Sequence, residues 1–192
     1  MTAWAEHRYA VVDVEGNGHQ PPDLVELAVV PVERGVIGEP VTWLFQPEQP
    51  ITAMARRIHG ISNDMVQGAP VFASRATEVQ ARLDGAVLVA HNASVDLGVL
   101  KRKLPGFAPD QVLDTLRLSR RLLPDQPNHR LGSLVSALHL GRDLPPGLRP
   151  HRADYDALVT ARLFVYLANS AASMPLSFEA LRGDPGGSDA LF

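Results

Sequence analysis

The chain has 192 residues, of which 45% are hydrophobic and 20% are charged, and this composition excludes a fully disordered protein and suits one folded domain. It contains no cysteine. Disulfides, zinc fingers, thiolate nucleophiles and iron–sulfur clusters are therefore excluded, and a bound metal would need oxygen or imidazole ligands. No apolar run approaches the ~18 residues of a membrane span, and the N-terminus lacks the apolar core of a signal peptide. We therefore expect no membrane association and a cytoplasmic location.

The net charge of −3 argues against a protein that coats DNA. The charge is unevenly distributed, because residues 99–152 carry ten Lys and Arg residues against four Asp residues. A basic stretch beside an acidic remainder suits a polyanion held next to a cation-binding carboxylate cluster, although a solvated Arg-rich surface would give the same pattern.

The first part of the chain predicts three antiparallel strands. Residues 9–13, 24–32 and 36–45 are apolar runs rich in β-branched residues, as expected for buried strands. A glycine-rich stretch at residues 16–18 ends the first run, and residues 33–35 have the length of a hairpin turn between the other two.

The rest of the chain alternates predicted helices and strands. Spacing and capping residues predict helices over residues 62–66, 74–83, 94–103, 115–123, 131–140 and 153–170, and strands over 86–90 and 111–114. Antiparallel strands followed by alternating helices and strands predict an α/β fold with a mixed five-stranded sheet that is flanked by helices. The first three strands would be antiparallel and the last two parallel.

The composition shifts to Ser, Gly, Pro and Asp from residue 171. This shift predicts a domain over residues 7–170 and a poorly ordered or loosely docked tail over residues 171–192. The apolar residues Leu176, Phe178 and Leu181 give the tail a means of docking on the domain.

Asp13 and Glu15 stand where the first predicted strand ends. Side chains at positions i and i+2 of a strand point to the same face, so both carboxylates project together. Two anions aimed at one spot repel each other unless a cation or a proton intervenes. Because the pair interrupts a strand that otherwise belongs in the core, it is a candidate functional site.

Two further carboxylates lie near the starts of predicted helices. Asp96 follows a buried strand and lies in the first turn of helix 94–103, where it could bind a ligand or complement the helix dipole. Asp156 lies early in the last helix, and His151 lies five residues before it. This spacing would put the two about 140° apart on a regular helix, so His151 must hang from the preceding loop, where it could also be an ordinary surface histidine.

Together these groups indicate a particular chemistry. Ligand sets made only of oxygen select Mg²⁺ or Mn²⁺, and two such ions about 4 Å apart clamp the attacking and leaving oxygens of a phosphodiester displacement. A histidine side chain titrates near neutral pH and can take the proton from the attacking water.

The motifs Asp13-x-Glu15, His91-Asn92-Ala-x-x-Asp96 and His151-x4-Asp156 resemble those of the DnaQ-like 3′–5′ exonucleases of the DEDDh type, which have a ribonuclease-H-like fold. Residues 24–28 and 58–62 also resemble family segments, so the resemblance covers roughly residues 9–168. It implies that two Mg²⁺ or Mn²⁺ ions are held by four carboxylates, those of Asp13, Glu15, Asp96 and Asp156. It also implies that His151 is the general base of an enzyme that releases nucleoside 5′-monophosphates from DNA 3′ ends.

The resemblance implies nucleic acid as the partner, with single-stranded 3′ ends of DNA favoured over RNA. The pocket for the terminal nucleotide would be lined by Val14, Gly16, Asn17, Gly18, His59, His91 and Asn92. His59 could equally be a turn residue with a satisfied ring. Backbone phosphates would meet four basic residues, Lys101, Arg102, Arg120 and Arg121.

Some positions depart from the family pattern. The stretch at residues 16–18 replaces Thr-Thr-Gly, which removes side-chain hydroxyl contacts to the nucleotide, and Val95 replaces a common Phe. Arg152 stands where the tyrosine variant of the superfamily has its Tyr, so that variant is excluded. Residues 119–124 and 145–148 look most like the stand-alone exonuclease X branch, with the proofreading subunit of DNA polymerase III as the better-known relative.

Several alternatives stay open. No polymerase-binding extension is evident, which favours a free-standing enzyme, but a polymerase or a repair protein stays open as a partner. An RNA-directed 3′–5′ exoribonuclease and a proofreading or accessory polymerase subunit would carry the same motifs. A non-catalytic binding module would need to have lost one of the five catalytic residues, and a small-molecule phosphatase would not need the basic stretch. The oligomeric state is not indicated.

Overall fold

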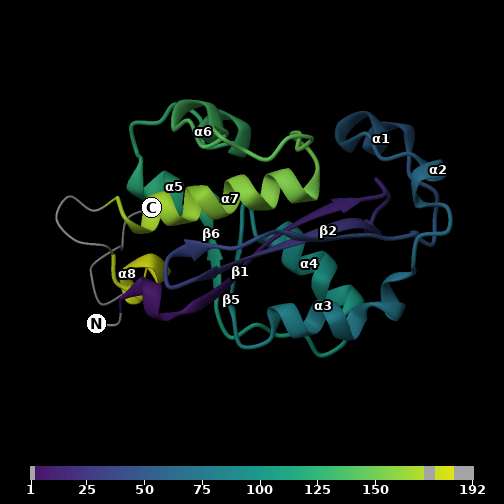
Figure 1. Cartoon of the computed structure of the whole chain (residues 1–192), viewed down its shortest axis with the longest axis horizontal. Coiled ribbons are helices and arrows are strands. Elements are labelled where there is room, and N and C mark those ends of the chain that lie inside the picture. The colour runs from purple at the N-terminus through teal and green to yellow at the C-terminus, as the bar shows by residue number, and fades with distance from the viewer. Residues whose placement is uncertain (1–2, 171–175, 184–192) are drawn as a thin grey trace.

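The computed structural model describes residues 3–170 and 176–183, and these residues form a mixed sheet between two layers of helices (Figure 1). The strands are β1 (Arg8–Gly16), β2 (Leu24–Glu33), β3 (Val36–Ile37), β4 (Val41–Leu44), β5 (Val87–Ala90) and β6 (Val112–Asp114). The order across the sheet is β3-β2-β1-β5-β6, and β4 pairs with β2. β1 is antiparallel to β2 and parallel to β5, which is parallel to β6. The predicted α/β fold class with a mixed sheet is confirmed.

The third predicted strand, residues 36–45, is divided into β3 and β4. Between them the Gly38 amide donates to the carbonyl of Pro31 at 2.8 Å, and Pro40 has no amide proton to give to a ladder. β3 then pairs with the end of β2, and β4 pairs with its first half. The sheet therefore has six strands rather than five.

The helical elements are η1 (Trp4–Glu6), α1 (Ala53–His59), α2 (Asn63–Val66), η2 (Phe72–Ser74), α3 (Ala76–Leu83), α4 (Ser94–Lys103), α5 (Thr115–Leu122), α6 (Leu131–Ala137), α7 (Ala153–Ala168) and α8 (Phe178–Arg182). Within the described part of the chain, none of these helices has the length and apolar character needed to cross a membrane.

Helix α1 was not predicted from the sequence. Its apolar residues Met54 and Ile58 are 65% and 53% exposed, so no apolar stripe marks a buried face. The helix is instead defined by its ends, because the Thr52 side chain accepts from the Ala55 amide and Gly60 closes the helix with φ of 74°.

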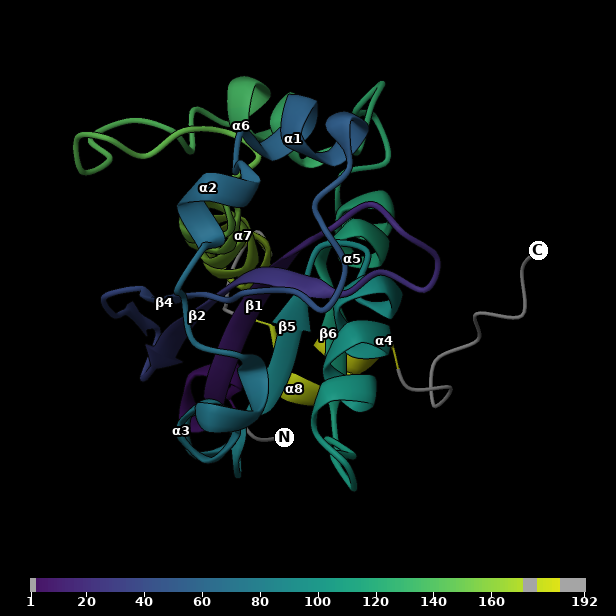
Figure 2. The same ribbon diagram turned by 90° about the vertical axis from the view of Figure 1, so that its right-hand side faces the viewer.

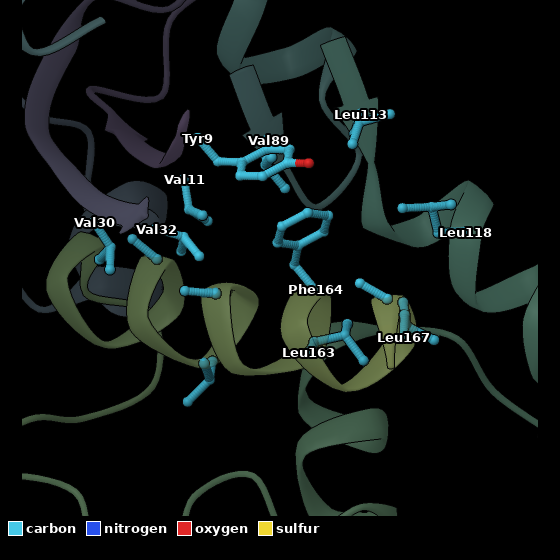
Figure 3. Close-up of a cluster of buried hydrophobic side chains, with 14 of the residues drawn as sticks. Tyr9, Val11, Val30, Val32, Val89, Leu113, Leu118, Leu163, Phe164 and Leu167 are labelled. Atoms are coloured by element: carbon cyan, nitrogen blue, oxygen red, sulfur yellow. The ribbon is translucent and has the colours of Figure 1, made fainter. Parts of the chain in front are cut away.

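Alternate residues of β1 face opposite helical layers. Tyr9 and Val11 belong to the core under α7, whereas Ala10 and Val12 belong to the core under α3 and α4. Figure 3 shows the first of these cores, in which the Tyr9 ring lies over Phe164 of α7 with ring centroids 4.7 Å apart. By the same alternation, Asp13 and Glu15 project toward the α7 side.

The strand β1 begins near α8 and runs toward α1, where the N-terminal end of α7 also lies (Figure 1). Figure 2 looks from that end, with α1 and α2 near the viewer and α7 seen almost along its axis. The carboxyl end of β1 therefore meets the first turn of α7.

Part of the predicted tail packs on the domain as α8. Phe178 and Leu181 are buried, and the Phe178 ring stacks on His7 with centroids 4.0 Å apart. The guanidinium of Arg121 donates to the carbonyls of Ala180 and Leu181. Residues 171–175 and 184–192 of the predicted tail lie outside the described residues.

Candidate active site

Three carboxylates converge at the carboxyl end of β1. Ligand oxygen atoms of Asp13, Glu15 and Asp156 all lie within 4.8 Å of one another. Asp13 and Glu15 come from β1, and Asp156 comes from the first turn of α7. The structure thus brings together three of the four predicted metal-binding carboxylates.

Asp96 approaches the same strand from the other helical layer. It lies in the first turn of α4 and is 5% exposed. Pairing of β1 with β5 ends at Val11, and beyond that point the Asp96 carboxylate accepts a hydrogen bond from the Val14 amide at 3.1 Å. Asp96 is not part of the group of oxygens within 4.8 Å, but it lies close enough for its charge to raise the pKa of Asp13.

Burial raises the pKa values of all four carboxylates, and the neighbouring acids add to the effect at Asp13 and Glu15. Burial, followed by the charges of Asp96 and Asp156, raises the pKa of Asp13 well above its ordinary value. Burial, followed by the charges of Asp156 and Glu26, raises the pKa of Glu15 to about 8. Burial is also the main reason that the pKa of Asp96 is raised to about 7 and that of Asp156 to about 6. A bound cation would lower these pKa values and so favour the fully ionised cluster at neutral pH.

His151 lies at the entrance to α7 with its backbone in the left-handed region, at φ of 61°. Its amide donates to Oδ2 of Asp156 at 3.1 Å, and the residue is exposed. Its charge opposes the effect of burial by lowering the pKa of Asp156. The predicted placement of His151 on a loop beside the acids therefore matches its position in the structure.

Glu26 was not predicted as a site residue, although a charged residue in the middle of an apolar strand is the signal that points to it. It lies on β2 directly across the ladder from Glu15 and is 1% exposed. Arg152 and the amide of Ala153 both donate to its carboxylate. This contact ties β2 to the start of α7.

The loop after β1 uses its own side chains to hold its shape. The Asn17 side chain is buried, accepts from the amides of His19 and Asp23, and donates to the carbonyl of Gln49. Gly18 has φ of 87°, and a Cβ there would lie 2.2 Å from Oγ1 of Thr52. Because the Asn17 amide group is engaged within the loop, any contact of residues 16–18 with a nucleotide falls to the backbone.

His59 supports this loop from α1. It is 3% exposed, and its Nδ1 accepts from the Ile61 amide at 3.0 Å. Its Nε2 therefore carries the proton and faces the carbonyl of Gly16 at 3.3 Å. Burial lowers the pKa of His59 and favours this neutral form. Both ring nitrogens of His59 therefore have hydrogen-bond partners within the protein, as expected for a turn residue.

His91 and Asn92 lie at the carboxyl end of β5. They line a cavity of about 530 Å³ together with Arg120 and residues 127–131. His91 is half-buried between Oγ1 of Thr115, at 2.9 Å, and the carbonyl of His129, at 3.0 Å. Asn92 has φ of 66°, and its amide donates to Asp114 at 2.9 Å.

The four basic residues predicted to contact phosphates differ in their surroundings. Lys101 and Arg120 are exposed, and Arg120 lines the cavity beside His91. Arg102 donates to the carbonyl of Pro22 at 3.0 Å. Arg121 donates hydrogen bonds to the carbonyls at the end of α8, so Arg120 is the better placed of these two arginines to contact a phosphate.

The donor set fits hard divalent cations. Asp13, Glu15 and Asp156 offer carboxylate oxygens within a short distance, and Asp96 keeps a second oxygen beyond the one that the Val14 amide occupies. Carboxylate oxygen is the ligand type that Mg²⁺ and Mn²⁺ prefer. The arrangement is suited to holding a phosphate diester against bound cations with a histidine at its side.

Comparison with known proteins agrees with this geometry. The model of the exonuclease family matches residues 10–164. The 3′–5′ exonuclease DinG of Bacillus subtilis is 38% identical over 177 residues, and the PolC-type DNA polymerase III of the same organism is 33% identical over 180 residues. These matches cover 88% and 90% of this chain but 18% and 12% of the relatives, so the chain spans less than a fifth of their length.

Two solved structures of exonucleases have a similar fold. Exonuclease X in complex with 5′-overhanging duplex DNA has a TM-score of 0.75 and 31% identity, over 91% of this chain and 98% of that one. A 3′-exonuclease described in recognition of the histone mRNA stem-loop has a TM-score of 0.68 over 88% of this chain and 84% of that one. Its identity of 17% shows a shared fold alone.

A mixed sheet with carboxylates gathered between β1 and α7 defines a nuclease of the ribonuclease-H-like fold. The chain belongs to the exonuclease family, in its DnaQ-like 3′–5′ branch, as its motifs predicted.

Proposed function

We propose that this chain is a metal-dependent 3′–5′ exonuclease that releases nucleoside 5′-monophosphates from DNA 3′ ends. The observation that carries the proposal is the convergence of Asp13, Glu15 and Asp156 within 4.8 Å, with His151 bonded to Asp156 at the same entrance. A general base beside a carboxylate cluster is what hydrolysis of a phosphodiester requires.

Two divalent ions, Mg²⁺ or Mn²⁺, would be held by Asp13, Glu15, Asp96 and Asp156. When bound, such ions polarise the phosphate, lower the pKa of a water and stabilise the leaving oxygen. The raised pKa values of the carboxylates support this assignment, because burial and then mutual repulsion raise them, and a divalent cation would compensate both effects.

His151 would accept the proton of the attacking water at a ring nitrogen. The new bond joins the water oxygen to the terminal phosphorus, and the bond from phosphorus to the 3′ oxygen of the preceding nucleotide breaks. The phosphate therefore leaves with the released nucleotide as a 5′-monophosphate. The backbone of His151 is held by Asp156 while its side chain stays exposed, so the ring can reach a substrate lying on the cluster.

The terminal nucleotide would lie against the backbone of Val14, Gly16, Asn17 and Gly18, with His59 behind that loop and with His91 and Asn92 on the far side. The bond between His59 and Gly16 keeps the loop in place. Lys101, Arg102 and Arg120 would meet the phosphates of the strand, with Arg121 contributing less because it contacts α8.

DNA is favoured over RNA as the substrate. Support comes from exonuclease X, which is 31% identical, is matched over 98% of its length and is solved with DNA. The structure described with histone mRNA shares 17% identity and therefore argues for the fold alone.

The test is digestion of DNA and RNA oligomers of one sequence, labelled at the 5′ end, with Mg²⁺, Mn²⁺ or EDTA. Single strands and duplexes with a 5′ overhang are compared, and released products are identified by chromatography against nucleoside 5′- and 3′-monophosphate standards. We expect a ladder shortened from the 3′ end and nucleoside 5′-monophosphates from DNA, and no reaction in EDTA or with Asp13→Asn. Preferential digestion of RNA would replace the DNA assignment, and release of 3′-monophosphates would contradict the mechanism.

A second candidate function is proofreading or accessory action for a DNA polymerase. It is favoured by the PolC-type relatives, which are 33% identical over nearly all of this chain. We would compare nucleotide release from primers with matched and mismatched 3′ ends, with and without a replicative polymerase. A mismatch preference that increases with polymerase supports this function, whereas rates unchanged by polymerase support the free-standing enzyme.

A further inference from the structure

Glu26 lies beside the proposed metal site without joining it. It stands directly across the β1–β2 ladder from Glu15, so the two carboxylates emerge on one face of the sheet. It is 1% exposed. A buried carboxylate at this position has to be either a fifth acidic ligand or a group with another partner.

Both oxygens of Glu26 are occupied by the start of α7. The Nε atom of Arg152 donates to Oε1 at 3.1 Å and to Oε2 at 2.9 Å, and Nη2 of Arg152 also donates to Oε1. The amide of Ala153 donates to Oε2 at 2.9 Å. Glu26 therefore binds the guanidinium and the first helical amide, which leaves it unsuited to hold a cation.

The segment held by this contact carries the two groups that α7 contributes to the site. Arg152 is the residue that precedes the helix, and its carbonyl accepts from the Asp156 amide at 2.9 Å. His151 comes directly before it, in a left-handed conformation that residues other than glycine adopt at a cost. The side chain of Asp156 closes the segment by accepting from the His151 amide.

We propose that the Glu26–Arg152 pair is a positioning device, which fixes His151 and Asp156 relative to the carboxylates of β1. Glu26 is paired directly with Glu15 in the β1–β2 ladder, so it anchors the start of α7 to the same strand pair that presents the β1 carboxylates. This inference rests on the proposed exonuclease function. Glu26 and Arg152 touch neither substrate nor cation, and they act through the backbone of residues 151–156.

The test uses Glu26→Gln and Arg152→Lys in the full chain. The first places an amide NH₂ group against the guanidinium, and the second keeps the charge but loses the planar fork that contacts both oxygens. We expect kcat on DNA to fall ~10–100-fold in each, the usual effect of losing an outer partner of a metal site, with KM within about twofold of wild type. The kcat of the double variant should fall no further than that of the less active single variant, because the two residues act as one unit.

A control separates positioning from general loss of stability. Leu167→Ala lies in the same helix at its far end, in the core, and touches nothing in the first turn. All variants are assayed well below their melting temperatures, after circular dichroism confirms that they fold. If Leu167→Ala lowers kcat as much as Glu26→Gln at a similar loss of melting temperature, the positioning role is overturned.

A second measurement, of Mn²⁺ binding, does not depend on nuclease activity. Mn²⁺ is titrated into each metal-free variant, and the concentration that gives half of the rise in melting temperature is recorded. We expect this concentration to increase ~10-fold or more in Glu26→Gln and Arg152→Lys, because Asp156 is displaced, and to stay unchanged in Leu167→Ala. An unchanged Mn²⁺ midpoint together with an unchanged kcat in either folded variant overturns the inference. A wild-type chain that binds Mn²⁺ but does not digest DNA would refute the proposed function alone.

Discussion

Glu15 and Glu26 occupy opposite positions of the same antiparallel ladder, yet α7 gives them different partners. Glu15 meets Asp156, a like charge, whereas Glu26 meets Arg152. Two residues four positions apart at the start of α7 thus place a carboxylate beside Glu15 and a guanidinium beside Glu26.

Removal of one carboxylate should abolish activity without loss of the fold. For Asp13→Asn we expect nucleotide release to fall by more than ~100-fold, beyond the range seen for outer residues of metal sites. The metal-free protein should melt at the same or a higher temperature, because a repelling charge is gone. Product release and thermal melts in EDTA measure the two effects. Retention of activity would remove Asp13 from the site.

His151→Ala should separate the general base from the metal site. We expect kcat to fall ~10²–10⁴-fold, the usual contribution of a general base. The metal site should be kept, because the hydrogen bond from the His151 backbone amide to Asp156 does not involve the ring. The rise in melting temperature on adding Mn²⁺ should match that of wild type. A strongly reduced rise would instead identify the histidine as a metal ligand.

The metal-free protein should lose stability as the pH rises. The pKa of Glu15 is raised to about 8 and that of Asp156 to about 6, whereas these side chains have pKa values near 4 in an unfolded chain. Between these limits the folded chain binds more protons than the unfolded one, so the free energy of unfolding falls as the pH rises. Melts in EDTA at about pH 5.5 and about pH 8 test this.

Two additions sharpen the pH experiment. Glu15→Gln should flatten the dependence, because the most shifted of the quantified groups is gone. Mg²⁺ should raise the melting temperature more at the higher pH, since protons compete with the cation for the carboxylates. A metal-free melting temperature that increases from pH 5.5 to pH 8 would contradict the raised pKa values of these carboxylates.

Gly18→Ala should damage the loop that follows β1. A left-handed conformation costs a residue with a side chain ~1–2 kcal/mol, and here the new methyl group also meets Thr52. Gly68→Ala is the matched control, because Gly68 has φ of 79° and a Cβ there meets none of the described atoms within 4 Å. Urea denaturation should show a larger loss for Gly18→Ala, and KM should rise in that variant alone. Equal losses of unfolding free energy in the two variants would show that the loop accommodates the new methyl group beside Thr52 without cost.

The adjacent residues Arg120 and Arg121 should have separable roles. On an inactive Asp13→Asn background, Arg120→Ala should weaken binding of single-stranded DNA and reduce the slope of log affinity against log salt concentration by about one. Arg121→Ala should lower the melting temperature with a smaller effect on DNA, because its guanidinium holds α8. Fluorescence anisotropy across a salt series distinguishes them, and the reverse result would exchange the two assignments.

The carboxylates were predictable because each interrupts a pattern. Asp13 and Glu15 break an apolar strand, and Asp156 follows Asp154 at a helix start where only one Asp can serve as the cap. The alternation of strands and helices then predicted that their segments meet at one edge of the sheet. Glu26 breaks a strand in the same way, but its partner Arg152 is 126 residues away, and no local rule pairs two such positions.

Short elements were the hardest to predict. Helix α1 turns its large apolar side chains, Met54 and Ile58, outward, so hydrophobic periodicity gives no signal there. Helix α8 has five residues in a stretch with the composition of a tail, and its stability comes from contacts with His7 and Arg121 far away in sequence. The division of β3 from β4 depends on a hydrogen bond from Gly38 to Pro31, which the run of apolar residues conceals.

The two ends of the described chain adjoin each other on the side of the sheet where β1 begins. Ala3 bridges to Ser177, and the Trp4 indole donates to Asn169. The carboxylates stand at the opposite end of β1, about 20 Å away at ~3.3 Å per residue. The first and last described segments therefore meet at the end of β1 that is far from the carboxylates, so their contacts leave the approach to the carboxylate cluster clear.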